Sequence, residues 1–155
     1  GGSIDLHAGQ FIDRIGVSLG LQFPAGQALE KFAGAAAGPV ELPVSVKGCK
    51  ASLSGPATAA ERKLAAGEDP AGIALGVQKV LAETFYRLIY NACSEYNTKS
   101  VLIAGGVASN TYIREYLHNK LTGRKISLWH PQARFSCDNA SGCAAFAVLK
   151  GEKSV

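Results

Sequence analysis

The chain of 155 residues contains no methionine, and it is poor in aromatic and in charged residues. Charged residues make up 18% of it, whereas an average soluble domain has roughly 25%. Hydrophobic residues make up 47%, which excludes a disordered chain, because so much apolar surface can offset the entropy lost on folding. Since the chain lacks methionine and starts with Gly1-Gly2-Ser3, we expect a single domain over residues 1–155 that is a piece of a longer protein.

Long apolar runs and paired cysteines are also absent. No stretch approaches the roughly 20 apolar residues of a membrane helix, so we expect no membrane contact. The four cysteines (Cys49, Cys93, Cys137 and Cys143) form no Cys-x-x-Cys pair. Reduced thiols in a cytoplasmic protein are therefore favoured over disulfides or a zinc site.

Charge of one sign is likewise weak. The net charge is +4, and the 16 Lys and Arg residues are scattered along the sequence. This pattern is compatible with a weak attraction to phosphate, but it predicts no dedicated DNA-binding surface.

Hydrophobic periodicity predicts an α/β fold. We expect strands over 41–46, 49–53, 100–103 and 125–129, with Lys47-Gly48 as the turn between the first two. We expect helices over 3–20, 54–66, 69–97 and 111–121, and one that starts at Pro24 and ends near 34–38. A loop at 130–136 precedes a last helix, which ends near 149.

The most specific local motif is a buried strand that runs into Gly105-Gly106 and then into a helix. Paired glycines let a ligand approach bare backbone, and the helix start offers free N–H groups. The motif is neither a Rossmann fingerprint nor a P-loop. A nucleotide contact and a plain tight turn are both open interpretations.

Three acidic residues lie in positions where carboxylates can bind ligands. Asp5 and Asp13 are expected to share a face of the first helix with Gly9, where two carboxylates beside a gap could bind ribose hydroxyls. A solvated helix face is the alternative. Asp138, just before the last helix, is an excellent helix cap, and one carboxylate alone does not define a metal site.

Taken in order, these motifs resemble the family of tRNA threonylcarbamoyladenosine transferases, formerly named glycoproteases or O-sialoglycoprotein endopeptidases. The similarity runs through residues 4–13, 19–26, 29–31, 42–48, 52–55, 104–110 and 137–140, and so covers nearly the whole chain in order.

The resemblance implies an actin-like ATPase fold, as in sugar kinases and chaperone ATPases, with this chain as the carboxyl-terminal lobe. It implies ATP or an acyl-adenylate as ligand and a divalent metal (iron, zinc or magnesium). By this resemblance, Gly9 and Asp13 would lie against the ribose, and Asp5 would also contact the nucleotide. The adenosine would lie near Gly105, Gly106 and Asn110. Asp138 would ligate the metal.

The resemblance further implies an amino-terminal lobe, partner proteins and tRNA as substrate. The His-x-x-x-His pair that the family contributes from its amino-terminal half is absent, and Ala25, Leu53 and Cys137 depart from the usual pattern. We therefore expect this chain alone to be inactive, and a homodimer can form through the face that the other lobe would cover. A divergent, non-catalytic nucleotide-binding or scaffold paralogue is the alternative. The old peptidase activity is least favoured, because no nucleophile is visible.

Overall fold

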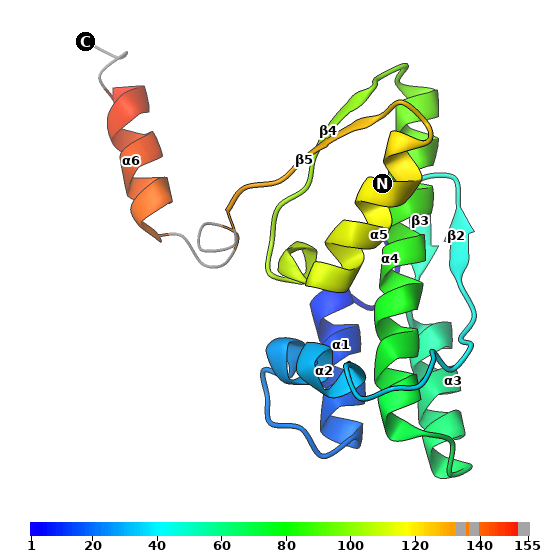
Figure 1. Cartoon of the computed structure of the whole chain (residues 1–155). Coiled ribbons are helices and arrows are strands. Elements are labelled where there is room, and N and C mark those ends of the chain that lie inside the picture. The colour runs from blue at the N-terminus through cyan, green and yellow to red at the C-terminus, as the bar shows by residue number, and fades with distance from the viewer. Residues whose placement is uncertain (133–135, 137–139, 152–155) are drawn as a thin grey trace.

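One long helix, α4 (Pro70–Glu95), runs the length of the molecule in the computed structural model (Figure 1), which describes residues 1–132, 136 and 140–151. Its start is fixed by Asp69, whose carboxylate accepts hydrogen bonds from the N–H groups of Ala71 and Gly72, with Pro70 as the first helical residue. Proline suits this position because the first helical N–H has no partner within the helix. The helix predicted over 69–97 is confirmed.

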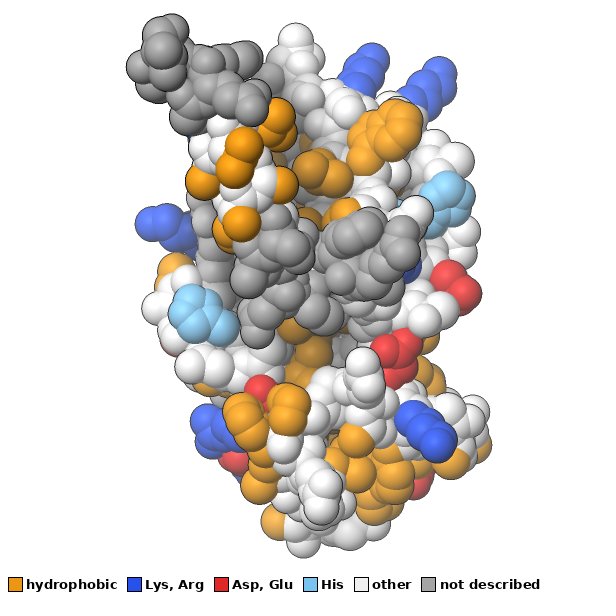
Figure 2. All heavy atoms as spheres, turned by 90° about the vertical axis from the view of Figure 1, so that its left-hand side faces the viewer, with side chains coloured by type: hydrophobic (Ala, Val, Ile, Leu, Met, Phe, Trp, Pro, Cys, Tyr) orange, Lys and Arg blue, Asp and Glu red, His pale blue; other side chains and the backbone are white. Residues whose placement is uncertain are grey.

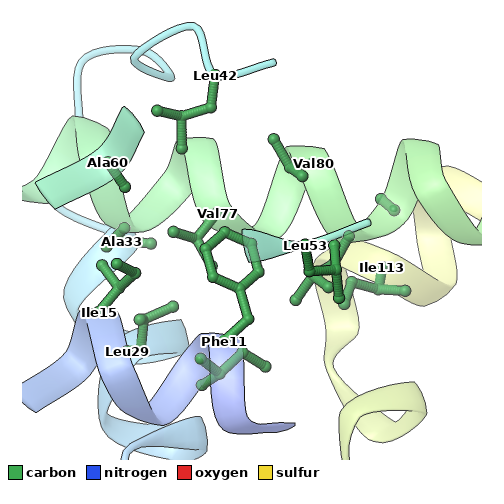
Figure 3. Close-up of a cluster of buried hydrophobic side chains, with 14 of the residues drawn as sticks. Phe11, Ile15, Leu29, Ala33, Leu42, Leu53, Ala60, Val77, Val80 and Ile113 are labelled. Atoms are coloured by element: carbon green, nitrogen blue, oxygen red, sulfur yellow. The ribbon is translucent and has the colours of Figure 1, made fainter. Parts of the chain in front are cut away.

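Four shorter helices pack against α4 or against one another around it: α1 (Ala8–Ser18), α2 (Gly26–Ala33), α3 (Ser54–Ala65) and α5 (Thr111–Thr122). Their apolar faces meet in a core drawn in Figure 3. Phe11 of α1 lies in its centre, fully buried, with Val77 of α4 and Leu29 of α2 also in the cluster. This core fixes the helices that carry the functional residues.

The predicted hairpin is present, but it is shorter than expected. Strands β2 (Ser45–Lys47) and β3 (Lys50–Ser52) pair antiparallel, with Val46 opposite Ala51. The turn is Gly48-Cys49, one residue later than predicted, and Gly48 has φ +56°, a conformation that favours glycine. Residues 41–44 are not strand, and Leu42 in this segment is buried with the core of the helices.

The prediction of a helix over 3–20 is wrong at its start. Gly2 and Ser3 form a short strand, β1, parallel to β3. The N–H of Gly2 donates to the carbonyl of Cys49, and the N–H of Ile4 donates to the carbonyl of Ala51. These bonds to a distant hairpin hold the segment extended, so α1 begins only at Ala8.

A second sheet joins β4 (Ser100–Leu102) and β5 (Ser127–Trp129) in parallel. Leu102 and Trp129 are paired in register, and both are exposed, at 71% and 63%. Helix α6 (Ala140–Gly151) stands apart from the other helices in Figure 1. Its Phe146, Val148 and Leu149 are also exposed, and Figure 2 shows hydrophobic side chains on this side of the molecule. None of the helices described here is both long and apolar enough to cross a membrane.

Candidate functional site

The strand before the glycine loop was predicted to be buried, which is wrong, because both ends of β4 are exposed. The loop after it has the turn that the Gly105-Gly106 motif predicts. Gly105 has φ +115°, which only glycine adopts without strain. Gly106 has φ −57° and ψ −45°, which any residue can adopt, and a Cβ built on it would meet no atom within 4 Å. A short 3-10 helix, η1 (Val107–Ser109), follows and leads into α5. Gly105 is therefore required by the backbone, whereas Gly106 leaves open space.

The loop also presents free hydrogen-bond donors. Among the described residues, no acceptor bonds the N–H groups of Ala104, Gly105 or Gly106. The carbonyls are used locally, since Ser109 donates through its Oγ to Gly105 and through its N–H to Gly106. Unpaired N–H groups in a turn before a helix suit an oxygen-rich or anionic ligand.

A hollow of about 730 Å³ opens beside this loop. Its walls come from α4, β4, the glycine loop and the residue before α1; they are His7, Phe85, Leu88, Ile89 and residues 101–108. Most of these side chains are apolar, and the polar groups are the backbone of the loop and the imidazole of His7. A flat, apolar ring with a few polar atoms matches such a wall.

The first turn of α1 lies next to the same loop. A Cβ placed on Gly9 would stand 4.0 Å from Cγ2 of Val107. Gly9 and Asp13 are one turn apart on α1, as predicted. The fold thus brings together two motifs that are nearly 100 residues apart in the sequence.

The predicted face of Asp5, Gly9 and Asp13 is wrong for Asp5, which lies before α1. Its carboxylate accepts hydrogen bonds from the Oγ of Ser52 and Ser54 (2.6 Å each) and from the N–H of Leu53 (2.9 Å) and Leu6 (2.6 Å). These bonds, those of Ser52 and Ser54 first, hold the pKa of the carboxyl group of Asp5 well below its ordinary value. Asp5 therefore ties the amino-terminal segment to the hairpin and to α3.

Asp13 and Asn110 also have partners within the chain. Asp13 Oδ1 accepts the N–H of Ala25 at 2.8 Å and so fixes the turn into α2. Asn110 is 7% exposed; its Oδ1 accepts the N–H of Ile113 at 3.0 Å, and its Nδ2 donates to Gln78 Oε1 at 3.2 Å. The side chain of Asn110 thus caps α5 and faces α4, and it is not part of the wall of the hollow.

Two residues near the site received no role from the sequence. His7 precedes α1, where its N–H donates to Gln10 Oε1, and it lines the hollow. Glu30 of α2 accepts the N–H of Thr111 at 2.8 Å, at the first residue of α5. Both lie within segments that carry the family resemblance, but no spacing rule links Glu30 to a residue 81 positions away.

Asp138, the predicted metal ligand, lies outside the described residues. Within the part of the chain that the structure describes, no three His, Cys, Asp or Glu side chains are grouped so as to hold a metal ion. Of the four cysteines, the three described ones (Cys49, Cys93 and Cys143) are free thiols.

The fold places the chain in a class. HypF from T. kodakarensis superposes with a TM-score of 0.70 at 24% identity, over 83% of this chain and 17% of that chain. A full-length HypF in its phosphate- and nucleotide-bound form superposes with a TM-score of 0.68 at 16% identity, over 82% and 18%. The chain shares the fold of these parts of HypF, in agreement with the predicted α/β fold of the actin-like ATPase type.

Within this class, the family model of tRNA N6-adenosine threonylcarbamoyltransferase matches residues 1–145, so the chain belongs to that family. A tRNA N6-adenosine threonylcarbamoyltransferase of Thermococcus sibiricus is 32% identical over 145 residues, which are 91% of this chain and 44% of the relative. A probable bifunctional tRNA threonylcarbamoyladenosine biosynthesis protein of Methanothermobacter thermautotrophicus is 30% identical over 149 residues, 96% of this chain and 28% of the relative. The chain thus spans less than half the length of these relatives.

Proposed function

We propose that this chain is the nucleotide-binding lobe of a transferase that attaches a threonylcarbamoyl group to N6 of adenosine in tRNA. The observation that carries the proposal is the apolar hollow against the Gly105-Gly106 loop, in a chain that belongs to this family. ATP or an acyl-adenylate is the ligand, and an amino-terminal lobe completes the site.

The geometry supports a division of roles among the predicted residues. The adenine ring lies on the apolar wall, where Gly106 leaves room for it and the free N–H groups of the loop donate to its ribose or phosphate oxygens. Gly9 lets the ribose come close to α1. Asp13 and Asn110 act by fixing the α1–α2 turn and the start of α5, and Asp5 by holding the segment before α1.

In this proposal the lobe contributes orientation. Acyl transfer gains most when the reacting carbonyl and the attacking nitrogen are held close in the correct geometry, which is worth several kcal/mol of the barrier. A divalent metal held in part by Asp138 would polarise the acyl-adenylate when bound. The residues that the structure describes do not by themselves assemble its site. The complete transferase acts on tRNA in the cytoplasm, together with partner proteins.

The test uses the complete protein, with both lobes and the partner proteins, and measures incorporation of radiolabelled threonine into tRNA. We expect incorporation by the wild type and its loss in the Gly106→Val variant. The 155-residue chain alone is expected to turn over no substrate, since the groups of the other lobe are missing. Nucleotide binding without any incorporation would instead favour a non-catalytic paralogue. Absence of both would refute the proposal.

A further inference from the structure

Tyrosines and cations line the seam between α4 and α5. On α5, Tyr112, Tyr116 and Lys120 follow one another at four-residue steps and so share one face of the helix, and Arg124 lies in the turn just after the helix ends. On α4, Tyr86 and Tyr90 are also one turn apart. We call these six residues the tyrosine–cation face. It lies outside the hollow at the glycine loop.

The rings and the cations of this face are in contact. Tyr86 stacks with Tyr90 and Tyr112 with Tyr116, with centroids 6.1 Å and 6.3 Å apart. Lys120 Nζ lies 5.9 Å from the ring centroid of Tyr86 and 5.5 Å from that of Tyr116. Rings at these distances attract an ammonium group and restrict where it points.

Arg124 is held by two different contacts with the tyrosines of α4. Its guanidinium lies 5.2 Å from the ring centroid of Tyr90, and its Nε donates to the hydroxyl of Tyr86 at 3.3 Å. Because only Nε has a protein acceptor among the described residues, the two terminal nitrogens remain available. A guanidinium presented in this way matches the two oxygens of a phosphate.

Among the described residues, no carboxylate forms an ion pair with Lys120 or Arg124, although the charge of Lys120 acts on the nearby Glu83. The nearby Glu83 accepts from Arg87 Nε at 2.6 Å and from the Tyr116 hydroxyl at 2.5 Å. No Asp or Glu of the described residues lies within 4.0 Å of the charged nitrogens of Lys120 or Arg124.

The same end of the molecule carries further positive charge. The N–H of Ser127 donates to the carbonyl of Lys99, which places the start of β4 beside the segment of Arg124 and Lys125. Residues 96–132 contain five Lys or Arg and one acid, Glu115, so this segment alone accounts for a charge equal to the net +4 of the chain.

We propose that the tyrosine–cation face binds the phosphodiester backbone of RNA, with Lys120 and Arg124 as its phosphate contacts. The proposal rests on the proposed function, because it assigns to the tRNA substrate a contact surface away from the nucleotide. The rings hold the cations in place, and the surplus of positive charge attracts a polyanion over a longer range.

The test measures binding of an unmodified tRNA transcript to the 155-residue chain by fluorescence anisotropy at several salt concentrations. The double variant Lys120→Gln/Arg124→Gln is compared with Lys31→Gln/Arg62→Gln. The second pair also removes one lysine and one arginine, but from exposed positions on α2 and α3, which lie at the other end of the molecule in Figure 1. Thermal melting checks that both variants are folded.

We expect the first variant to lose on the order of tenfold in affinity, and the slope of log affinity against log salt to fall by about 2, one for each phosphate contact. The control should stay close to the wild type. If Lys120→Gln/Arg124→Gln does not fold, the single variant Lys120→Gln should lower the slope by about 1. No tRNA binding by the wild type, or equal losses in both pairs, overturns the proposal. ATP binding by the same preparations reports on the proposed function separately, because neither pair lines the hollow.

Discussion

Gly9 lies against Val107: a Cβ on this glycine of α1 would stand 4.0 Å from Cγ2 of the valine that follows the glycine loop. The contact joins the two segments to which the sequence assigned a nucleotide. Phe11 anchors α1 in the core, and Ile113 anchors α5, which follows the loop, so packing sets the relative position of the two segments. The hollow is preformed, which lowers the entropy cost of binding.

The two glycines of the loop should respond differently to substitution. Gly105→Ala forces a side chain into φ +115° and should cost about 1–3 kcal/mol of unfolding free energy. A Cβ on Gly106 would meet no protein atom within 4 Å, and the backbone there is ordinary, so Gly106→Val should change stability by no more than about 0.5 kcal/mol. The affinity for ATP should nevertheless fall at least about tenfold, or roughly 1.4 kcal/mol, because the new side chain fills the space of the ligand. Thermal melting and titration calorimetry measure the two effects. Parallel losses of affinity and stability at Gly106 would favour a plain turn.

The sequence was sufficient where the signals are local. The cap at Asp69 with Pro70, the glycine pair of the loop and the apolar stripe of α4 each act within a few residues, and these features are present as predicted. The hairpin is also present, but its strands are shorter and its turn comes one residue later. The predicted start of α1 was wrong because Gly2 and Ile4 form hydrogen bonds with hairpin residues that are about 47 positions away in the sequence. The hydrogen bonds of Asp5 with Ser52, Leu53 and Ser54 and the contact of Glu30 with Thr111 depend on the same kind of long-range packing.

Asp138 offers a test that separates a helix cap from a metal ligand. Asn caps a helix about as well as Asp, so Asp138→Asn should leave the melting temperature nearly unchanged. The change removes a negative charge from a site of hard oxygen ligands, and metal affinity of the complete protein should fall at least about tenfold. Bound-metal analysis of the wild type and the variant decides between the two roles. Equal metal contents would show that Asp138 is not a ligand.

Asp5 should make the stability of the chain depend on acid pH. Its folded pKa lies below the value of about 3.9 for an unfolded Asp, so its contribution is fully present above that pH. As the pH falls below about 4 toward the folded pKa, the contribution is lost. Asp5→Asn keeps an acceptor for Leu6 and Leu53 but does not ionise, so part of the acid sensitivity should disappear. Melting temperatures from pH 7 to pH 2 test this; identical pH profiles of wild type and Asp5→Asn would contradict it.

The exposed pair Leu102 and Trp129 should make the isolated chain self-associate. Both side chains lie on the outer face of the β4–β5 sheet, and exposed apolar patches of this kind favour contact between molecules. Leu102→Lys should shift the chain toward the monomer in sedimentation velocity at tens of micromolar. Val17→Lys, at an exposed apolar position on α1, is the matched control and should not. A wild-type chain that is monomeric throughout this range would rule out the homodimer.

Asn110 separates structural support from ligand contact most directly, because two substitutions affect its two bonds differently. Asn110→Ala removes the cap of α5, at a cost of about 1 kcal/mol, and leaves the buried Gln78 without its partner, at a further cost of about 1–3 kcal/mol. Asn110→Asp keeps the cap, and the amide of Gln78 can turn to donate to the new carboxylate. The aspartate variant should therefore be clearly more stable than the alanine variant in urea unfolding.

The same two variants report on the nucleotide. If Asn110 acts by fixing the loop and the start of α5, ATP affinity should follow stability: nearly retained in Asn110→Asp and reduced in Asn110→Ala. A direct hydrogen bond from Asn110 Nδ2 to adenosine would be lost in both, and the added negative charge would weaken binding of a polyphosphate further in the aspartate variant. We expect the first pattern, because Nδ2 already donates to Gln78 and the side chain is 7% exposed, facing α4 and away from the hollow. Titration calorimetry with ATP on the folded variants distinguishes the patterns, and a loss in Asn110→Asp that equals or exceeds the loss in Asn110→Ala would place the amide on the ligand.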